Sequence, residues 1–324
     1  MDKVLLRNSE RTEYKRCRWR WDLHYNHRWT PVQSKPALRF GDLVHQALAE
    51  FYRPGVERGP HPAETFDRLY EEDADALGDF GFTADDEWEE AKDLGLAMLD
   101  HYIDVYGQDP DMEVIAPEMP FQVDIYNPKN GRYLVTMVGS LDLVVRWRPT
   151  GKIGLVDHKT AKAIQTAHLG LDEQAGAYWA FAGEFLRQQG YLEDGEEIDF
   201  ILYNFLRKAK PDPRPEDERG RKLNKDGSVS KSQPPPYFHR EAVYRSETDR
   251  QNLINRVRAE AWEMAKVREG KLPLIKNPTQ DCHWDCPMFD VCELHETGAD
   301  WEEMLSVAYT TWDPYAAHRE SLEE

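Results

Sequence analysis

The stretch from residue 139 to residue 178 constrains the fold most, because it places acidic residues in two strand-like runs joined by a turn. The runs read GSLDLVVRW and KIGLVDHKT, and the letters PTG stand between them. Val, Leu and Ile favour strands, and the Pro and Gly favour a reversal of the chain. Asp142 lies in the first run, and Asp157 and Lys159 close the second. Because residues two apart in a strand point to one face, we expect Asp157 and Lys159 to project together.

Two carboxylates and a lysine at one strand edge suit metal-dependent phosphodiester cleavage. Carboxylate oxygens are ligands for Mg²⁺ or Mn²⁺, and such a cation acidifies water and neutralises charge on a phosphate. A nearby lysine can orient that water or meet the same charge. The alternative interpretation is a surface ion pair between Lys159 and Asp142 or Asp157, since Asp-X-Lys is a common sequence.

Two predicted helices supply further candidate residues. The segment FGDLVHQALAEFY, residues 40–52, has apolar residues at helical spacing, and His45 lies beside that stripe. Such a histidine is either a structural residue or a metal ligand. In a second helix, expected over residues 171–187, Gln174 and Tyr178 are four residues apart and share one face. Packing explains an aromatic residue on that face, but it does not explain the glutamine.

The four cysteines form a second pattern. Cys17 is alone near the start, whereas Cys282, Cys286 and Cys292 lie close together near the end. The first residues contain no apolar run long enough for a secretion signal and no run of 18 apolar residues exists, so we expect a cytoplasmic protein without a membrane span. Disulfides are rare in a reducing compartment, and clustered thiols there indicate a metal centre. Zinc and a cubane iron–sulfur cluster both take four thiolates, and spacing does not separate them.

These features together resemble a known family. The residues that carry the resemblance are Asp142, the run Asp157-His158-Lys159-Thr160, and Gln174 with Tyr178. The pattern is similar to the PD-(D/E)XK nuclease superfamily and, more narrowly, to the RecB-like exonucleases, which include the CRISPR-associated exonucleases and the AddB nuclease domain. That branch also carries an upstream helical histidine and four cysteines divided between the two ends, and both are present here. The resemblance touches residues 9–52, 113–206 and 250–295.

The resemblance implies an α/β fold with a central mixed β-sheet flanked by helices, as in restriction endonucleases. It implies a Mg²⁺ or Mn²⁺ site formed by His45, Asp142, Asp157 and the backbone carbonyl of His158, with Glu118 as a further candidate ligand. Lys159 would then orient the attacking water, and Gln174 and Tyr178 would position the substrate. The four ligands implied for one 4Fe–4S cluster, with zinc as the alternative, are Cys17, Cys282, Cys286 and Cys292. Such a cluster would join the N-terminal and C-terminal segments like a staple.

The implied activity is that of an exonuclease on DNA ends, often on single strands, in recombination, replication, repair or CRISPR adaptation. One alternative is a non-catalytic module that binds DNA ends, although the complete set of acids and lysine argues against it. Another is a nuclease subunit that works with a helicase or another recombination or replication partner. Because no GXXXXGK(S/T) phosphate loop occurs in the chain, any such motor would be a separate protein.

Charge is unevenly distributed along the chain. The formal net charge is −19, yet residues 61–118 alone hold 19 acidic and 2 basic residues. Basic residues gather in residues 1–40 and again in residues 207–240, so a polyanion could meet local basic surfaces. The candidate DNA contacts are Arg18, Trp19, Arg20, Lys208 and Lys210. The alternative is that the tryptophans pack inside the protein and the charges are merely solvated.

The sequence divides into six expected parts. They are an N-terminal helical segment (1–53), an acidic helical insert (54–112), a nuclease core (113–206), a mobile basic loop (207–236), a last strand with a helix and the cysteines (237–297), and an acidic helical tail (298–324). The loop is expected from its Pro-rich composition and lack of periodicity.

Overall fold

The computed structural model describes residues 3–32, 36–78, 86–316 and 318–319, and its centre is a six-stranded mixed sheet. The strands are β1 (Leu5–Arg7), β3 (Met112–Tyr126), β4 (Tyr133–Trp147), β5 (Lys152–Ala161), β6 (Ile198–Arg207) and β7 (Phe238–Tyr244). Strands β3, β4 and β5 form an antiparallel meander, β5 pairs in parallel with β6, and β7 completes the sheet antiparallel to β6. The predicted mixed sheet and the predicted hairpin at residues 139–160 are therefore confirmed.

The sheet splits along β4. Strand β3 accompanies β4 on one side, while the other side pairs first with β1 at residues 136–138 and then with β5 at residues 143–147. In the described part of the chain, residues 139–142 have no ladder partner on that second side. The split therefore leaves an opening beside Asp142, within the hairpin formed by β3 and β4.

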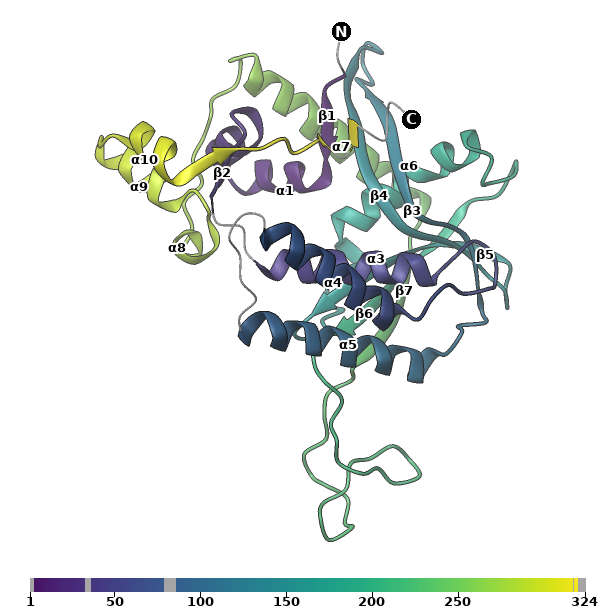
Figure 1. Cartoon of the computed structure of the whole chain (residues 1–324). Coiled ribbons are helices and arrows are strands. Elements are labelled where there is room, and N and C mark those ends of the chain that lie inside the picture. The colour runs from purple at the N-terminus through teal and green to yellow at the C-terminus, as the bar shows by residue number, and fades with distance from the viewer. Residues whose placement is uncertain (1–2, 33–35, 79–85, 317, 320–324) are drawn as a thin grey trace.

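Helices cover both faces of the sheet (Figure 1). On one face lie α3 (Pro36–Phe51), α4 (Pro62–Gly78) and α5 (Asp86–Tyr106), whose apolar side chains form one core with β3 to β6. On the other face lie α1 (Asn8–Arg16), α6 (Glu173–Gln188) and α7 (Glu247–Arg268), which share a second core with β1 and the same strands. The sequence pattern explains α3, since Val44, Leu48 and Phe51 form a helical stripe that is buried.

The two chain ends meet in a small module beside the sheet. It contains α2 (Arg18–Trp21), a π-helical turn (Asp22–Asn26), α8 (Cys282–Asp285), α9 (Phe289–Thr297) and α10 (Trp301–Ala308). The short strand β2 (Trp29–Pro31) pairs antiparallel with β8 (Tyr309–Thr311). A purely helical tail was therefore wrong for residues 309–311, because three residues are too few to show a strand pattern. Residues 320–324 of that tail lie outside the described residues.

Two segments extend the core. The acidic insert provides α4 and α5, as predicted, and its residues 79–85 lie outside the described residues. Residues 208–236 form a long excursion between β6 and β7 that projects from the body (Figure 1). This excursion contains bridges between Glu216 and Lys222 and between Leu223 and Val229. It therefore has local structure that its composition did not predict. None of the described helices combines the length and apolar character needed to cross a membrane.

Candidate active site

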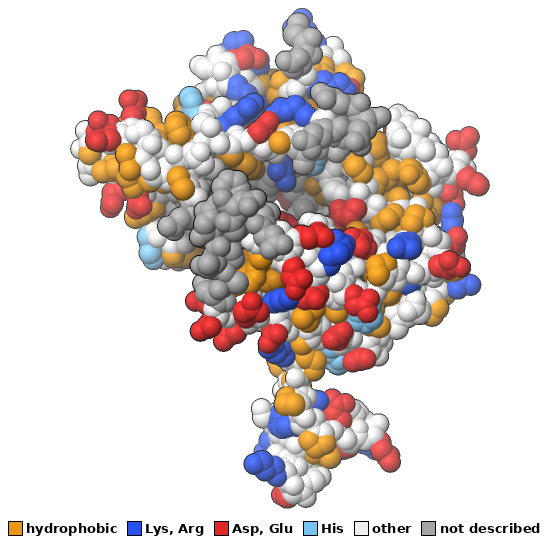
Figure 2. Space-filling model, viewed as in Figure 1, with side chains coloured by type: hydrophobic (Ala, Val, Ile, Leu, Met, Phe, Trp, Pro, Cys, Tyr) orange, Lys and Arg blue, Asp and Glu red, His pale blue; other side chains and the backbone are white. Residues whose placement is uncertain are grey.

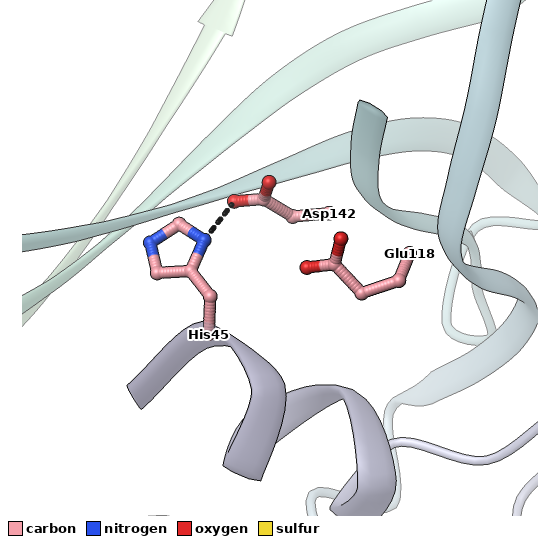
Figure 3. Close-up of side chains that lie close together, drawn as sticks. All are labelled: His45, Glu118 and Asp142. Carbon is pink, nitrogen blue, oxygen red and sulfur yellow. Dashed lines mark ion pairs between the residues drawn. The ribbon is translucent and has the colours of Figure 1, made fainter. Parts of the chain in front are cut away.

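Three side chains from three elements converge beside the split in the sheet. His45 comes from α3, Glu118 from β3 and Asp142 from β4, and one ligand atom of each lies within 4.8 Å of the others (Figure 3). The Nδ1 atom of His45 is 3.4 Å from Oδ2 of Asp142. One imidazole nitrogen and two carboxylate oxygens form a donor set that suits a divalent cation. Among the described residues, no other group of three or more His, Cys, Asp and Glu side chains is this close.

Glu118 reaches this site through an unusual backbone conformation. Its φ is +38°, in the left-handed region, although it lies within β3. The neighbouring pairs are Pro117 with Leu143 and Met119 with Leu141, so Glu118 stands opposite Asp142. Non-glycine residues rarely adopt such a φ, and they concentrate at functional sites. The sequence made Glu118 only a candidate, and the structure places it in the group.

Asp142 is held as a carboxylate. The backbone amide of His158 donates to its Oδ2 over 2.8 Å, at the point where β4 and β5 separate. Burial tends to raise the pKa of Asp142, but the imidazole of His45 and the His158 amide outweigh burial and lower it. The side chain is therefore ionised before any cation arrives.

Asp157 and Lys159 project together, as their spacing in β5 predicts. The Nζ atom of Lys159 is 2.8 Å from Oδ2 of Asp157. Burial raises the pKa of Asp157 to about 6, the charge of Lys159 opposes the rise, and the charge of Asp142 adds to it. Asp157 lies outside the closest group of ligands, and its carboxylate pairs with Lys159.

Gln174 and Tyr178 line the same cleft from the first turns of α6. The helix begins there because the side chain of Asp172 accepts a hydrogen bond from the amide of Ala175, 2.9 Å away. The ring of Tyr178 packs directly on β4 at Gly139, where a Cβ atom would lie 2.3 Å from the phenol oxygen. Only glycine permits this approach, so the absence of a side chain at residue 139 allows the ring of Tyr178 to pack against β4.

The cleft above these residues has a volume of about 1080 Å³. Its opposite wall comes from β1, α1 and α2, and includes Arg7, Thr12, Arg16 and Arg20. The Nε atom of Arg20 donates to Glu13 over 3.0 Å, whereas its Nη1 atom is buried without a hydrogen-bond partner among the described residues. Arginine side chains that line a cleft opposite a carboxylate site suit phosphate groups. The sequence indicated Arg20 but missed Arg7 and Thr12, which carried no motif.

The other predicted DNA contacts lie in different surroundings. Trp19 is 8% exposed, and Lys276, His295 and Trp301 pack against its ring. Its predicted contact with a base is therefore not supported, because its ring is covered. Arg18 pairs with Glu263 at 2.8 Å.

The two predicted contacts in the basic loop lie near its base. The ammonium group of Lys208 stands 4.8 Å from the centre of the Phe40 ring. Lys210 lies 3.5 Å from Asp93 of α5. Both lysines thus contact the helical layer that contains α3 and α5.

A buried polar network, which the sequence did not reveal, lies beneath His158. The amide nitrogen of Asn204 donates to Nδ1 of His158 over 2.8 Å and to the hydroxyl of Tyr102 over 3.0 Å. The carbonyl oxygen of Asn204 accepts from Arg240, which also pairs with the buried Asp109. Burial lowers the pKa of His158 to about 3, so the ring is neutral and can accept this bond. The network therefore holds the side chain of His158, which lies in β5 directly after Asp157.

All four cysteines lie in the end module, and three of them, Cys17, Cys286 and Cys292, pack against its apolar cluster. Cys17 separates α1 from α2, Cys282 begins α8, Cys286 follows it, and Cys292 lies in α9. All four are free thiols of intermediate burial. The amide of Thr279 lies 3.3 Å from the sulfur of Cys282 and lowers the pKa of that thiol.

Basic side chains stand near three of these thiols. They are Arg16 near Cys282, Arg20 near Cys286 and Lys276 near Cys292. Cationic groups favour thiolates, which are the form that binds metals. Burial outweighs them at Cys286 and Cys292, however, and raises the pKa of both thiols.

The fold and the site together define a nuclease built on a split mixed sheet. Residues 9–293 match the PD-(D/E)XK nuclease superfamily, and the chain belongs to that family. A solved structure of a proposed exonuclease from Eubacterium rectale is similar, with 13% identity over 86% of each chain and a TM-score of 0.46. No curated protein matches the sequence.

Proposed function

We propose that this protein is a Mg²⁺- or Mn²⁺-dependent DNA exonuclease that hydrolyses phosphodiester bonds at the ends of single strands. The observation that carries the proposal is the convergence of His45, Glu118 and Asp142 on the floor of an open cleft. Family membership supports the nuclease activity, and the donor set supports a hard divalent cation. The pair of Asp157 and Lys159 lies next to this group, in the order that the family pattern requires.

The donor set fits such a cation. Three ligand atoms lie within 4.8 Å of one another, Asp142 is already ionised, and burial raises the pKa of Glu118 in a site that gathers negative charge. In the proposal, Asp157 and the backbone carbonyl of His158 complete the ligand set. A bound cation would supply charge neutralisation at the phosphate and a more acidic attacking water.

The remaining residues of the site act on the substrate. Lys159 is held at 2.8 Å by Asp157, so its ammonium group is oriented without being a ligand. It would orient the attacking water and stabilise the charge that develops on the phosphate. Gln174 and Tyr178 would position the scissile phosphate, and Arg20 would bind a neighbouring phosphate across the cleft.

The test is a cleavage assay on end-labelled linear and closed circular single-stranded DNA, with Mg²⁺ or Mn²⁺ and with EDTA. We expect metal-dependent loss of the linear DNA alone, and no loss with Asp157→Ala. Cutting of the circle would contradict exonuclease action and indicate an endonuclease. If folded wild-type protein cleaves neither DNA, the non-catalytic binding module or a required helicase partner replaces this proposal.

We also propose that Cys17, Cys282, Cys286 and Cys292 hold one 4Fe–4S cluster. The fold brings the four cysteines from the two ends of the chain into one small module. A 4Fe–4S cluster and tetrahedral zinc both take four thiolates, and zinc is the alternative occupant. The cluster would hold α1 and α2 against α8 and α9, and thereby support the Arg16 and Arg20 wall of the cleft.

Iron content and thermal unfolding test this part of the proposal. Cys286→Ala should lose iron and unfold at a lower temperature, because the cluster closes a very long chain loop. His283→Ala is the matched control, since His283 is an exposed neighbour on α8 whose ring contacts the carbonyl of Gln280. Unchanged iron content in the cysteine variant would contradict the cluster.

The biological setting is part of the same proposal. An activity on free DNA ends belongs to recombination, replication or repair, with a protein partner from one of these processes. Four free cysteines suit a reducing compartment, which supports a cytoplasmic location.

A further inference from the structure

A second hollow adjoins the cleft on the far side of Glu118. This apolar groove has a volume of about 490 Å³ and lies between the outer strand β3 and the C-terminal end of α6. Glu118 and His318 line both the groove and the active-site cleft, so the two spaces meet at a proposed metal ligand. Figure 2 shows hydrophobic side chains gathered on the side of the molecule where β3 and α6 lie.

The groove has the character of a base-binding surface. Its rim includes Ile115, Pro117, Pro120 and Tyr191, and Tyr191 is 41% exposed. Buried apolar side chains such as Phe121 form its floor. Proline rings and aromatic rings offer flat apolar surfaces for the face of a nucleobase. Two exposed amides at the groove, Gln122 and Gln189, can meet the polar edge of such a base.

The distribution of charge separates this groove from the phosphate side of the cleft. Among the residues that the structure describes, no lysine or arginine lines the groove, and the one acidic residue is Glu118, at the boundary with the cleft. The cleft, by contrast, carries Arg7, Arg16 and Arg20 on its opposite wall. A nucleic acid that crosses Glu118 would therefore keep its phosphates on the arginine side and direct a base into the groove.

A peptide strand is a poorer occupant of this groove. In the described part of the chain, β3 pairs with no strand but β4, and its outer edge bridges Gly55 at Val114. The rest of that edge could in principle accept another strand. Pro117 and Pro120 lack backbone N–H groups, however, and proline blunts an edge strand against such pairing. The groove therefore favours an occupant recognised by its flat faces.

We propose that this groove is the subsite for the unpaired base of a nucleotide next to the scissile phosphate. The inference rests on the proposed exonuclease function and specifies its substrate. A base in a duplex has both faces stacked and its edge paired, so only an unpaired nucleotide can enter the groove. The groove therefore selects single-stranded ends.

The experiment uses short oligothymidylate strands in which one abasic residue occupies each of the four terminal positions in turn. Cleavage is measured as kcat/KM with Mn²⁺, and binding is measured by fluorescence anisotropy with Ca²⁺ in its place. For the wild type, we expect an abasic residue at one position to weaken cleavage and binding about 5- to 150-fold, the range for one stacked base. Tyr191→Ala should show the same loss with the intact strand and no further loss at that abasic position.

Matched variants make the result decisive. Tyr126→Ala is the control, because Tyr126 is a tyrosine at the end of β3 that is 46% exposed and does not line the groove. Ile115→Ala is a second groove variant and should weaken binding in the same way as Tyr191→Ala. If the abasic strands behave like the intact strand, or if Tyr191→Ala behaves like Tyr126→Ala, the base subsite is overturned while the nuclease proposal stands. Absence of both cleavage and binding by the wild type would overturn both.

Discussion

At the scale of single residues, Lys159 tests the division of roles within the site. Its ammonium group contacts Asp157 and lies outside the close group of His45, Glu118 and Asp142. Lys159→Ala should lower kcat by about 10²–10³, the typical cost of losing one charge-stabilising donor, and leave Mn²⁺ binding intact. Lys152→Ala, at the exposed start of the same strand, is the control. Near-normal turnover in Lys159→Ala would refute the catalytic role.

The close packing of Tyr178 on Gly139 leads to a second prediction at this scale. A methyl group there would meet the phenol of Tyr178 at 2.3 Å, so Gly139→Ala should displace that ring. We expect a loss of about 1–3 kcal/mol in the free energy of unfolding, together with weaker cleavage. Gly183→Ala on α6 meets nothing within 4 Å and should be neutral or slightly stabilising. Equal unfolding temperatures for the two variants in a thermal denaturation experiment would contradict the close packing of Tyr178.

Residue patterns predicted part of the site and missed the rest for identifiable reasons. The alternation of strand residues was enough to pair Asp157 with Lys159. The position of Glu118 was not predictable, because its positive φ depends on how β3 packs against β4. The burial of Trp19 depends on α9 and α10, which are far away in the sequence.

At the scale of elements, Asn204 connects strand β6 to β5, α5 and β7 through its side chain. Both of its amide N–H groups and its carbonyl oxygen have partners in the buried network. Asn204→Leu should cost about 1–3 kcal/mol in unfolding free energy, because buried partners lose their hydrogen bonds. Asn252→Leu, on an exposed position of α7, should have little effect. A denaturant titration with similar midpoints for both variants would show that the network contributes no stability.

The length of an element decided whether the sequence revealed it. The central strands and the helices α3, α6 and α7 have enough residues for their periodicity to appear. Strands β1, β2 and β8 have three residues each, and long-range pairing alone defines them. The split in the sheet depends on β1, so the opening beside Asp142 could not be predicted either.

At the scale of the whole molecule, the excursion between β6 and β7 should be separable from the core. Its hydrogen bonds are largely internal, and the amide of Arg207 closes its base by donating to the carbonyl of Tyr237 over 2.8 Å. Replacing residues 213–234 with a short Gly–Ser linker should change the unfolding temperature by no more than about 4 °C, because loop-closure entropy varies slowly with loop length. A larger fall in differential scanning calorimetry would show that the excursion stabilises the body.

The central claim is that one cation site on the split sheet joins α3, β3 and β4, and calorimetric titration with Mn²⁺ tests it most directly. The wild type should bind Mn²⁺, and Asp142→Asn should lose that binding, although its amide oxygen can still accept the hydrogen bond from His158. Asp93→Asn, which changes an exposed acid of α5 beside Lys210, is the matched control and should bind like the wild type. Equal Mn²⁺ affinity in the wild type and Asp142→Asn would contradict the account.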